Sequence, residues 1–327
     1  MAPSRQVGVS VGVDPPAWHI GTREGSGTSM RIGLLGTGPW ARAAHAPALA
    51  AHREVEFTGV WGRRPEAAGE LAALHGTRAY DDVDALLADV DAVAVALPPS
   101  VQAELAVRAA RAGRHLLLDK PLATTVTGAR AVAEAVREAE VASVVFFTTR
   151  FQSATEAWIA EQAARGGWFT ARAEWLGAVF TGDSPYAASP WRREKGALWD
   201  VGPHALSVLM PVLGDVTRVR AAGRGPGDTV HGVLEHEGGA SSTVTLSLTA
   251  PVAAAGVGVE FRGESGVAVL PRASEGVVEA FGRAVDALAG AVGAPPSAGR
   301  GFACDARFGL RVTEVLAEVE GVLGVRG

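Results

Sequence analysis

The pattern of apolar and polar positions divides the chain into two unlike halves. In the first half, short runs of apolar residues alternate with segments of helical periodicity. The apolar runs cover residues 31–35, 55–61, 90–97, 115–119 and 142–148, and the helical segments cover residues 65–75, 101–112 and 126–139. Fully apolar strands separated by helices are typical of a parallel sheet covered on both faces. Because crossovers are right-handed, residues 30–150 are predicted to form an α/β, doubly wound Rossmann domain.

The second half is predicted to be an α+β domain over residues 151–327. Segments rich in β-branched residues cover 168–179, 216–222, 230–236, 241–249, 257–262 and 267–270, and only 198–213, 277–292 and 308–323 have helical periodicity. This pattern indicates an open, mostly antiparallel sheet. Its open face could be buried against another subunit, so we expect a homodimer or homotetramer. Residues 294–301 are rich in Pro, Gly and Ser and are expected to form a loop between helices.

The first 29 residues are rich in Gly, Pro and Ser and lack the apolar core of a signal peptide. Met30 immediately precedes the first predicted strand. We therefore expect residues 1–29 to be a disordered extension, or upstream sequence included by an early start codon.

Composition excludes several classes of partner. The net charge is −5 and basic clusters are short, which argues against nucleic acid. No run of 18 apolar residues exists, so no membrane span is expected. A single cysteine excludes an intramolecular disulfide and fits a reducing, cytoplasmic setting. The histidines do not show metal-ligand spacing, so no metal site is predicted.

A glycine motif follows the first strand, and its residues are Gly36, Thr37, Gly38, Pro39, Trp40 and Ala41. The first glycine permits a tight turn, and the second lets the backbone approach a pyrophosphate. The small Ala41 lets helix and strand pack closely, with the pyrophosphate at the helix N-terminus. The motif lies between a strand and a helix, which favours a dinucleotide site over a merely structural glycine turn.

The end of the second strand carries the run Trp61-Gly62-Arg63-Arg64, where the adenosine ribose of a dinucleotide would lie. An acidic residue there would hold the 2′-hydroxyl of NAD, but none occurs before Glu66. Two guanidinium groups could instead pair with a 2′-phosphate. NADP is therefore favoured over NAD, and the alternative is a solvated arginine pair at a helix start.

Two further strand ends are expected at the nicotinamide end of the crevice. Leu97-Pro98 ends one, and Asp119-Lys120 ends the next. Lys120 is one of only two lysines among 30 basic residues, the other being Lys195. A position that keeps lysine against this bias can use an ammonium group whose pKa is able to shift. The alternative is that both lysines persist by chance at the surface.

Asp200 and His204, in the run GALWDVGPHAL, are four positions apart and would share one face of a helix. Pro203 is favourable only in a first turn, so the helix is predicted to start near Asp200. A carboxylate beside an imidazole suits a proton shuttle near neutral pH. The alternative is an Asp near a helix N-terminus with an unrelated His.

The glycine motif, the run AGRHLLLDKPLA and the run WRREKGALWDVGPHAL together resemble the Gfo/Idh/MocA (glucose–fructose oxidoreductase / inositol dehydrogenase) family over residues 30–327. The resemblance implies a Rossmann domain and an open-sheet domain that usually mediates oligomerisation. It also implies NAD(P)-dependent oxidation or reduction of a carbon in a sugar or polyol.

Carried over residue by residue, the resemblance makes Lys120 the catalytic lysine and makes Asp200 and His204 the substrate-side pair. Trp191-Arg192 resembles a dipeptide that contacts substrate. Two positions depart from the family pattern. Asp119 replaces the usual Glu, which puts its cofactor contact in doubt, and Gln102 stands where many members carry His, from which nothing is concluded.

The expected chemistry is hydride transfer between C4 of the nicotinamide and a carbinol or carbonyl carbon. His204 would act as general base or acid on the substrate oxygen, Lys120 would stabilise developing alkoxide charge, and Asp200 would orient the pair. Two alternatives stay open: a glycoside hydrolase that works through a tightly held NAD, and a regulator that binds a dinucleotide without catalysis.

Overall fold

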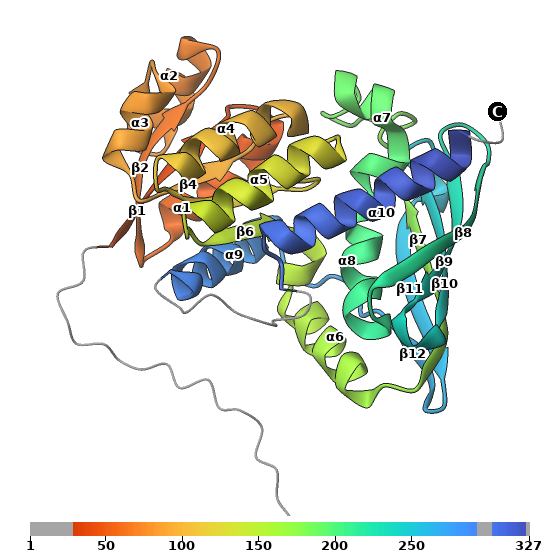
Figure 1. The fold of residues 1–327 in the computed structure, drawn as a ribbon. Helices are drawn as coiled ribbons and strands as arrows, with labels where there is room; N and C mark the ends of the chain where they lie inside the picture. Colours follow the sequence, from red (N-terminus) through yellow and green to blue (C-terminus); the bar gives the residue numbers. More distant parts are fainter. Residues whose placement is uncertain (1–28, 293–302, 325–327) are drawn as a thin grey trace, which may run out of the picture.

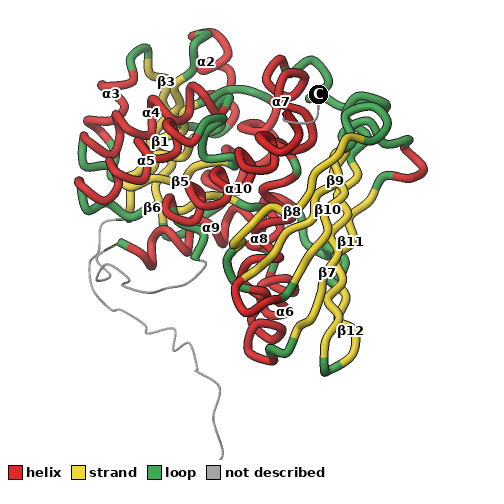
Figure 2. Tube along the Cα trace, turned by 45° about the vertical axis from the view of Figure 1, so that its right-hand side comes forward, coloured by secondary structure: helices red, strands yellow, loops and turns green. Residues whose placement is uncertain are grey.

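The computed structural model describes residues 29–292 and 303–324. The predictions for residues 1–28 and for the loop over 294–301 therefore lie outside the described residues. Figure 1 shows a first sheet with its helices beside a second, larger sheet, with helices α8 and α10 between them and α9 below the first sheet. Figure 2 shows the same arrangement from a second direction.

The first sheet has six parallel strands in the order β3-β2-β1-β4-β5-β6. The strands are β1 (Met30–Leu35), β2 (Val55–Trp61), β3 (Arg78–Tyr80), β4 (Ala92–Val95), β5 (His115–Asp119) and β6 (Ser143–Phe146). The order reverses direction at β1, as in a doubly wound fold. The predicted Rossmann sheet is confirmed, although the three-residue β3 was too short and polar to stand out in the sequence.

The helices of the first half begin where the sequence favours a helix start. They are the π-helical turn η1 (Ala41–His45), α1 (Ala46–Ala51), α2 (Pro65–Leu74), α3 (Val83–Asp89), α4 (Pro99–Arg111) and α5 (Val126–Glu138). The side chains of Asp82 and Thr125 cap α3 and α5 by accepting backbone N–H groups at 3.0 and 3.1 Å. Proline occupies the first turn of α2 and α4, where its missing N–H costs nothing.

The second sheet has the order β12-β11-β7-β10-β9-β8. Its strands are β7 (Trp168–Leu176), β8 (Val216–Arg224), β9 (Val230–His236), β10 (Ser241–Ser247), β11 (Gly256–Gly263) and β12 (Gly266–Val269). Only the central pair β7 and β10 is parallel, and the other neighbours are antiparallel. The prediction of a mostly antiparallel sheet is confirmed.

The helices of the second half correct one prediction. They are α6 (Ser153–Arg165), α7 (Pro190–Asp200), α8 (Gly202–Leu213), α9 (Val277–Ala291) and α10 (Ala306–Gly324), with short 3₁₀ turns at η2 (Thr148–Phe151), η3 (Glu237–Gly239) and η4 (Val252–Ala254). The single helix expected over 198–213 is wrong, because α7 ends at Asp200 and α8 begins at Gly202, with Val201 as a turn between them and Pro203 in the first turn of α8. Helix α6 was not predicted.

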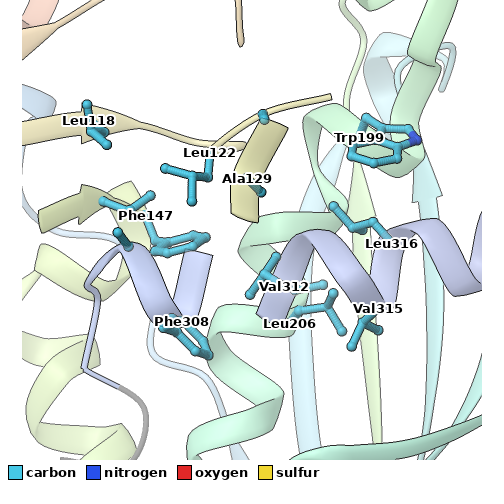
Figure 3. Close-up of a cluster of buried hydrophobic side chains, with 14 of the residues drawn as sticks. Leu118, Leu122, Ala129, Phe147, Trp199, Leu206, Phe308, Val312, Val315 and Leu316 are labelled. Atoms are coloured by element: carbon cyan, nitrogen blue, oxygen red, sulfur yellow. The ribbon is translucent and has the colours of Figure 1, made fainter. Parts of the chain in front are cut away.

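The last two helices of the described residues both pack on the first half, and α10 also packs on the second. Helix α9 packs against the first sheet, where Phe281 contacts the ring of Phe146 at a centroid distance of 5.0 Å. Figure 3 shows apolar side chains of α10 that face both halves: Phe308 lies near Phe147 of the first half, and Val312 lies near Leu206 of the second. None of the helices described here is long and apolar enough to cross a membrane.

Candidate active site

A cavity of about 840 Å³ lies at the carboxyl ends of strands β1, β2, β4 and β5. This is where ligands bind in doubly wound sheets. The second half supplies the opposite wall from β7, the segment before α7, and the starts of α7 and α8. Among the residues predicted from sequence, those that line the cavity are Thr37, Gly38, Pro39, Trp40, Arg63, Arg64, Leu97, Pro98, Asp119, Lys120, Trp191, Arg192, Asp200 and His204.

In the glycine motif, Gly36 is required by the fold, whereas Gly38 lines the cavity. Gly36 has φ +129°, and a Cβ there would lie 2.3 Å from the carbonyl oxygen of Ala96, so only glycine lets β1 and β4 approach. A Cβ on Gly38 would meet no atom within 4 Å, which leaves its backbone open to a ligand. Gly36, Ala41 and Trp61 themselves do not line the cavity.

Arg63 and Arg64 line the cavity at the end of β2, and both are exposed. Within residues 29–292 and 303–324, neither guanidinium makes an ion pair or a hydrogen bond. Both side chains therefore keep their donors available for an anionic ligand.

Three charged side chains in the cavity wall, Lys120, Arg192 and Asp200, form a cluster in which both cations contact Asp200. Lys120 Nζ donates to the Asp200 carbonyl at 2.7 Å and to its Oδ1 at 3.0 Å, and Arg192 Nε donates to its Oδ2 at 2.9 Å. The Asp200 side chain is only 7% exposed. Burial alone would raise the pKa of Asp200, but Lys120 and Arg192 outweigh it and lower that pKa to about 2. Asp200 is therefore a permanent anion that holds two cations.

This geometry differs from the pairing expected between Asp200 and His204. Asp200 ends α7 and His204 lies in the first turn of α8, so they do not share a helix face. No hydrogen bond joins the two side chains in the described structure, and both oxygens of Asp200 are taken by Lys120 and Arg192. Asp200 thus orients the two cations and not the imidazole.

His204 is held by packing instead. Its ring stacks on Trp175 of β7 with centroids 5.2 Å apart and planes 12° from parallel. Burial, with Lys120 nearby, lowers the pKa of His204 well below its usual value. The imidazole is therefore neutral at physiological pH and can accept a proton.

Asp119, the residue before Lys120, faces a second buried histidine. Its Oδ1 accepts the Lys120 backbone N–H at 2.8 Å, and its Oδ2 lies 3.9 Å from Nε2 of His45. Burial raises the pKa of Asp119 to about 6 even though Lys120 and Arg192 oppose this. Burial lowers the pKa of His45 to about 3, so this imidazole is neutral.

Two aromatic side chains of the second half that line the cavity, Tyr186 and Trp175, were not predicted from the sequence. Arg192 lies over the rings of Tyr186 and Trp191, at 4.8 and 4.6 Å from their centroids. Tyr186 also meets Trp40 of the glycine motif edge-on, with centroids 6.3 Å apart. The segment between β7 and α7 has no helical or strand periodicity, so only its aromatic residues could have indicated a site.

Two carboxylates hold the segment that ends in Asp200. Helix α7 is kinked at Gly196, whose φ is +63°, and the next residue, Ala197, donates its N–H to Asp228 Oδ2 at 3.0 Å. Glu320 of α10 accepts from Trp199 Nε1 at 3.0 Å and from Lys195 Nζ at 3.3 Å. Lys195 thus has a structural partner outside the cavity.

Two family models match the chain. Residues 30–147 match the model described as "Oxidoreductase family, NAD-binding Rossmann fold", and residues 172–269 match the "GFO/IDH/MocA C-terminal domain". Together the two matched ranges cover every strand of both sheets except the first four residues of β7.

Among curated proteins, the chain is 34% identical over 211 residues to a dTDP-3,4-didehydro-2,6-dideoxy-α-D-glucose 3-reductase of Streptomyces violaceoruber. That alignment covers 63% of this chain and 60% of the relative's own length. The chain is 32% identical over 240 residues to "D-xylose 1-dehydrogenase (NADP(+)) 2" of Haloferax volcanii, covering 68% of this chain and 70% of the relative.

Among solved structures, GenD2 from gentamicin A biosynthesis in complex with NAD has a TM-score of 0.77 at 21% identity. The match covers 97% of this chain and 98% of that one. UDP-N-acetylglucosamine 3-dehydrogenase from Acidithiobacillus ferrooxidans has a TM-score of 0.74 at 22% identity, with 91% and 99% covered. At these identities the similarity shows a shared fold over nearly the whole chain.

Proposed function

Because this chain belongs to the Gfo/Idh/MocA family, we propose that it is an NADP-dependent oxidoreductase acting on a CH–OH group, or its carbonyl counterpart, of a sugar-like or polyol substrate. The curated relatives named above are a sugar-nucleotide reductase and a pentose dehydrogenase. Their substrates differ, so the individual substrate of this chain is left to experiment.

One observation carries the proposal: Lys120, Asp200 and His204 line the same cavity as the glycine motif and the arginine pair. In this proposal the dinucleotide and the side chains that move the proton share one cavity, which a dehydrogenase requires. A protein that only binds a dinucleotide has no need for a buried ammonium–carboxylate pair beside a neutral imidazole.

The residues present fit a nicotinamide dinucleotide. The open backbone at Gly38 and the neighbouring Thr37 would hold the pyrophosphate, and Leu97 and Pro98 would contact the nicotinamide ribose. When bound, the cofactor supplies the acceptor or donor of a hydride. The protein's own side chains position the substrate, and they take up its proton in oxidation or donate one in reduction.

In this proposal each of the three polar side chains has a distinct role. Neutral His204 accepts the proton of the substrate hydroxyl in oxidation. Lys120 donates a hydrogen bond to the same oxygen and stabilises its developing negative charge. Asp200, which bonds both Lys120 and Arg192, keeps the ammonium group in place and balances its charge.

The preference for NADP rests on Arg63 and Arg64, which face the cavity without ion-pair partners among the described residues. Two guanidinium groups match the charge and geometry of a 2′-phosphate. The names of the relatives do not decide the matter, because one carries NADP(+) in its name and one solved structure contains NAD.

A fluorescence titration with NADPH and NADH tests the proposal, with nicotinamide emission excited through the tryptophans. Tighter binding of NADPH is expected, followed by turnover when keto-sugars and polyols are screened with that cofactor. Binding of neither cofactor, in protein shown to be free of prebound nucleotide, would contradict the proposal. Release of free sugar from an aryl glycoside without a change in nicotinamide absorbance would identify the hydrolase instead.

We also propose that the protein forms a homodimer or homotetramer through the second sheet. In the described structure, α8 and α10 cover one face of this sheet and no helix covers the other (Figure 1). Val233, Val267 and Val269 on strands β9 and β12 are 37%, 52% and 59% exposed. Light scattering after size-exclusion chromatography measures the assembly, and a monomer at micromolar concentration would contradict it.

A further inference from the structure

Gln102 of α4 is 1% exposed, and its side chain makes four hydrogen bonds to the backbone around Lys120. Its Oε1 accepts the N–H of Asp119 at 2.8 Å. Its Nε2 lies 2.7 Å from the carbonyl oxygen of Asp119, and 3.2 and 3.3 Å from those of Pro121 and Leu122. The contacts therefore lie on both sides of Lys120.

These bonds replace a missing strand partner. The pairing of β4 with β5 ends at Ala94 and Leu117, so the backbone of Asp119 lies past the end of β4 on that side. Buried backbone groups without partners are costly, and both the N–H and the carbonyl of Asp119 need one. An amide side chain is one of the few groups that can donate and accept at the same time.

The segment held in this way carries the lysine of the cavity. Lys120 directly follows Asp119, and its ammonium group reaches Asp200 across the cavity. A displacement of the backbone at residues 119–122 would move the base of the lysine side chain while Asp200 stays fixed by Arg192 and by the α7 segment.

We propose that Gln102 is a positioning residue that sets the place of Lys120 in the active site. The inference rests on the role of Lys120 in the proposed function, but the position of Lys120 can be measured without any substrate. If Gln102 served only general stability, its loss would lower the melting temperature and leave the environment of Lys120 unchanged in the folded protein.

The test uses the fact that the chain has only two lysines. Protein grown with lysine labelled with ¹³C at Cε gives one NMR signal from Lys120 and one from Lys195. Gln102→Leu removes the donor and the acceptor at similar volume. We expect the Lys120 signal to shift or broaden, the Lys195 signal to stay, and kcat on a working substrate to fall roughly 10²-fold with cofactor affinity nearly unchanged.

Two further variants separate positioning from stability. Gln162→Leu makes the same change at another glutamine, which is 2% exposed and lies in α6, and should leave both lysine signals in place. Gln102→His keeps one donor and one acceptor and should return the Lys120 signal toward its original position.

A Lys120 signal at its original position in folded Gln102→Leu would overturn the proposal, whatever the activity. If Gln102→Leu does not fold, Gln102→Glu replaces it. Its carboxylate can still accept the Asp119 N–H, but it cannot donate to the three carbonyl oxygens that the Gln102 amide contacts and is repelled by them. An unchanged Lys120 signal in that variant would overturn the proposal equally. If the Lys120 signal shifts in the variant but the original protein turns over no substrate, the result supports the role of Gln102 and contradicts only the proposed function.

Discussion

The ammonium group of Lys120 donates to both the backbone carbonyl and the carboxylate of Asp200, a residue eighty positions further along the chain. The two hydrogen bonds join the end of β5 to the end of α7, and so join the two walls of the cavity. The lysine is therefore oriented by the second half of the molecule although it belongs to the first.

Replacing Lys120 should remove catalysis and spare cofactor binding. For Lys120→Met we expect kcat to fall by roughly 10² to 10⁴, because the hydrogen bond that stabilises charge on the substrate oxygen is lost. Lys195→Met is the control, since Lys195 pairs with Glu320 outside the cavity. Steady-state kinetics with NADPH measures both, and an equal loss in the two variants would refute the assignment.

The charge of Asp200 should stabilise the fold above pH 4. Its folded pKa of about 2 lies below the ordinary 3.8, so the stabilisation is present above the unfolded pKa and is lost as the pH falls through about 2. A shift of this size corresponds to about 2 kcal/mol. Asp200→Asn should lower the free energy of unfolding by about that amount at pH 7, and the difference should shrink between pH 4 and pH 2.

Urea unfolding across this pH range measures the effect of Asp200→Asn. Asp183→Asn serves as a control because Asp183 is exposed, and its free energy of unfolding should follow that of the original protein. A difference for Asp200→Asn that does not change with pH would show that its carboxylate is not stabilised as proposed.

Asp119 should show the opposite dependence on pH. Its folded pKa of about 6 lies above 3.8, so its favourable contribution is present below the unfolded pKa and is lost as the pH rises through about 6. Asp119→Asn cannot ionise and can still accept the Lys120 N–H. Relative to the original protein, this variant should gain about 3 kcal/mol of stability between pH 4 and pH 8, measured by the same urea titrations.

The arginine pair should distinguish NADPH from NADH. Arg63→Ala and Arg64→Ala are each expected to weaken NADPH binding by roughly tenfold to a hundredfold, because each removes a charge-assisted contact. The affinity for NADH should change little. Arg53→Ala, at an exposed arginine outside the cavity, controls for net charge. Equal weakening of both cofactors would show that the pair does not recognise a 2′-phosphate.

The sequence predicted the parts of the site that follow strands. Lys120 and Arg63 follow apolar runs within two residues. Because the carboxyl ends of parallel strands meet at one edge of the sheet, the hydrophobic pattern and the order of the strands were enough to predict that these residues lie along the same edge. The fold class follows from the same two kinds of periodicity.

The sequence could not predict how Asp200 and His204 meet the cavity. Their spacing of four indicated one helix, but α7 ends at Asp200 and His204 belongs to the next helix, and the kink at Gly196 redirects the segment. Gln102 was visible in the sequence, yet its function depends on the backbone of β5, which lies next to α4 only after folding. Tyr186 and Trp175 reach the cavity through tertiary contacts that no periodicity describes.

Helix α9 has a consequence for the order in which the molecule can assemble. It covers one side of the first sheet, where Phe281 packs on Phe146 and His45, yet among the helices of the described residues only α10 follows it in the chain. When residues 30–150 have emerged from the ribosome, every strand of the first sheet has been synthesised, but α9 has not. We expect the nascent sheet to keep an apolar face exposed until Val277–Ala291 has emerged as well.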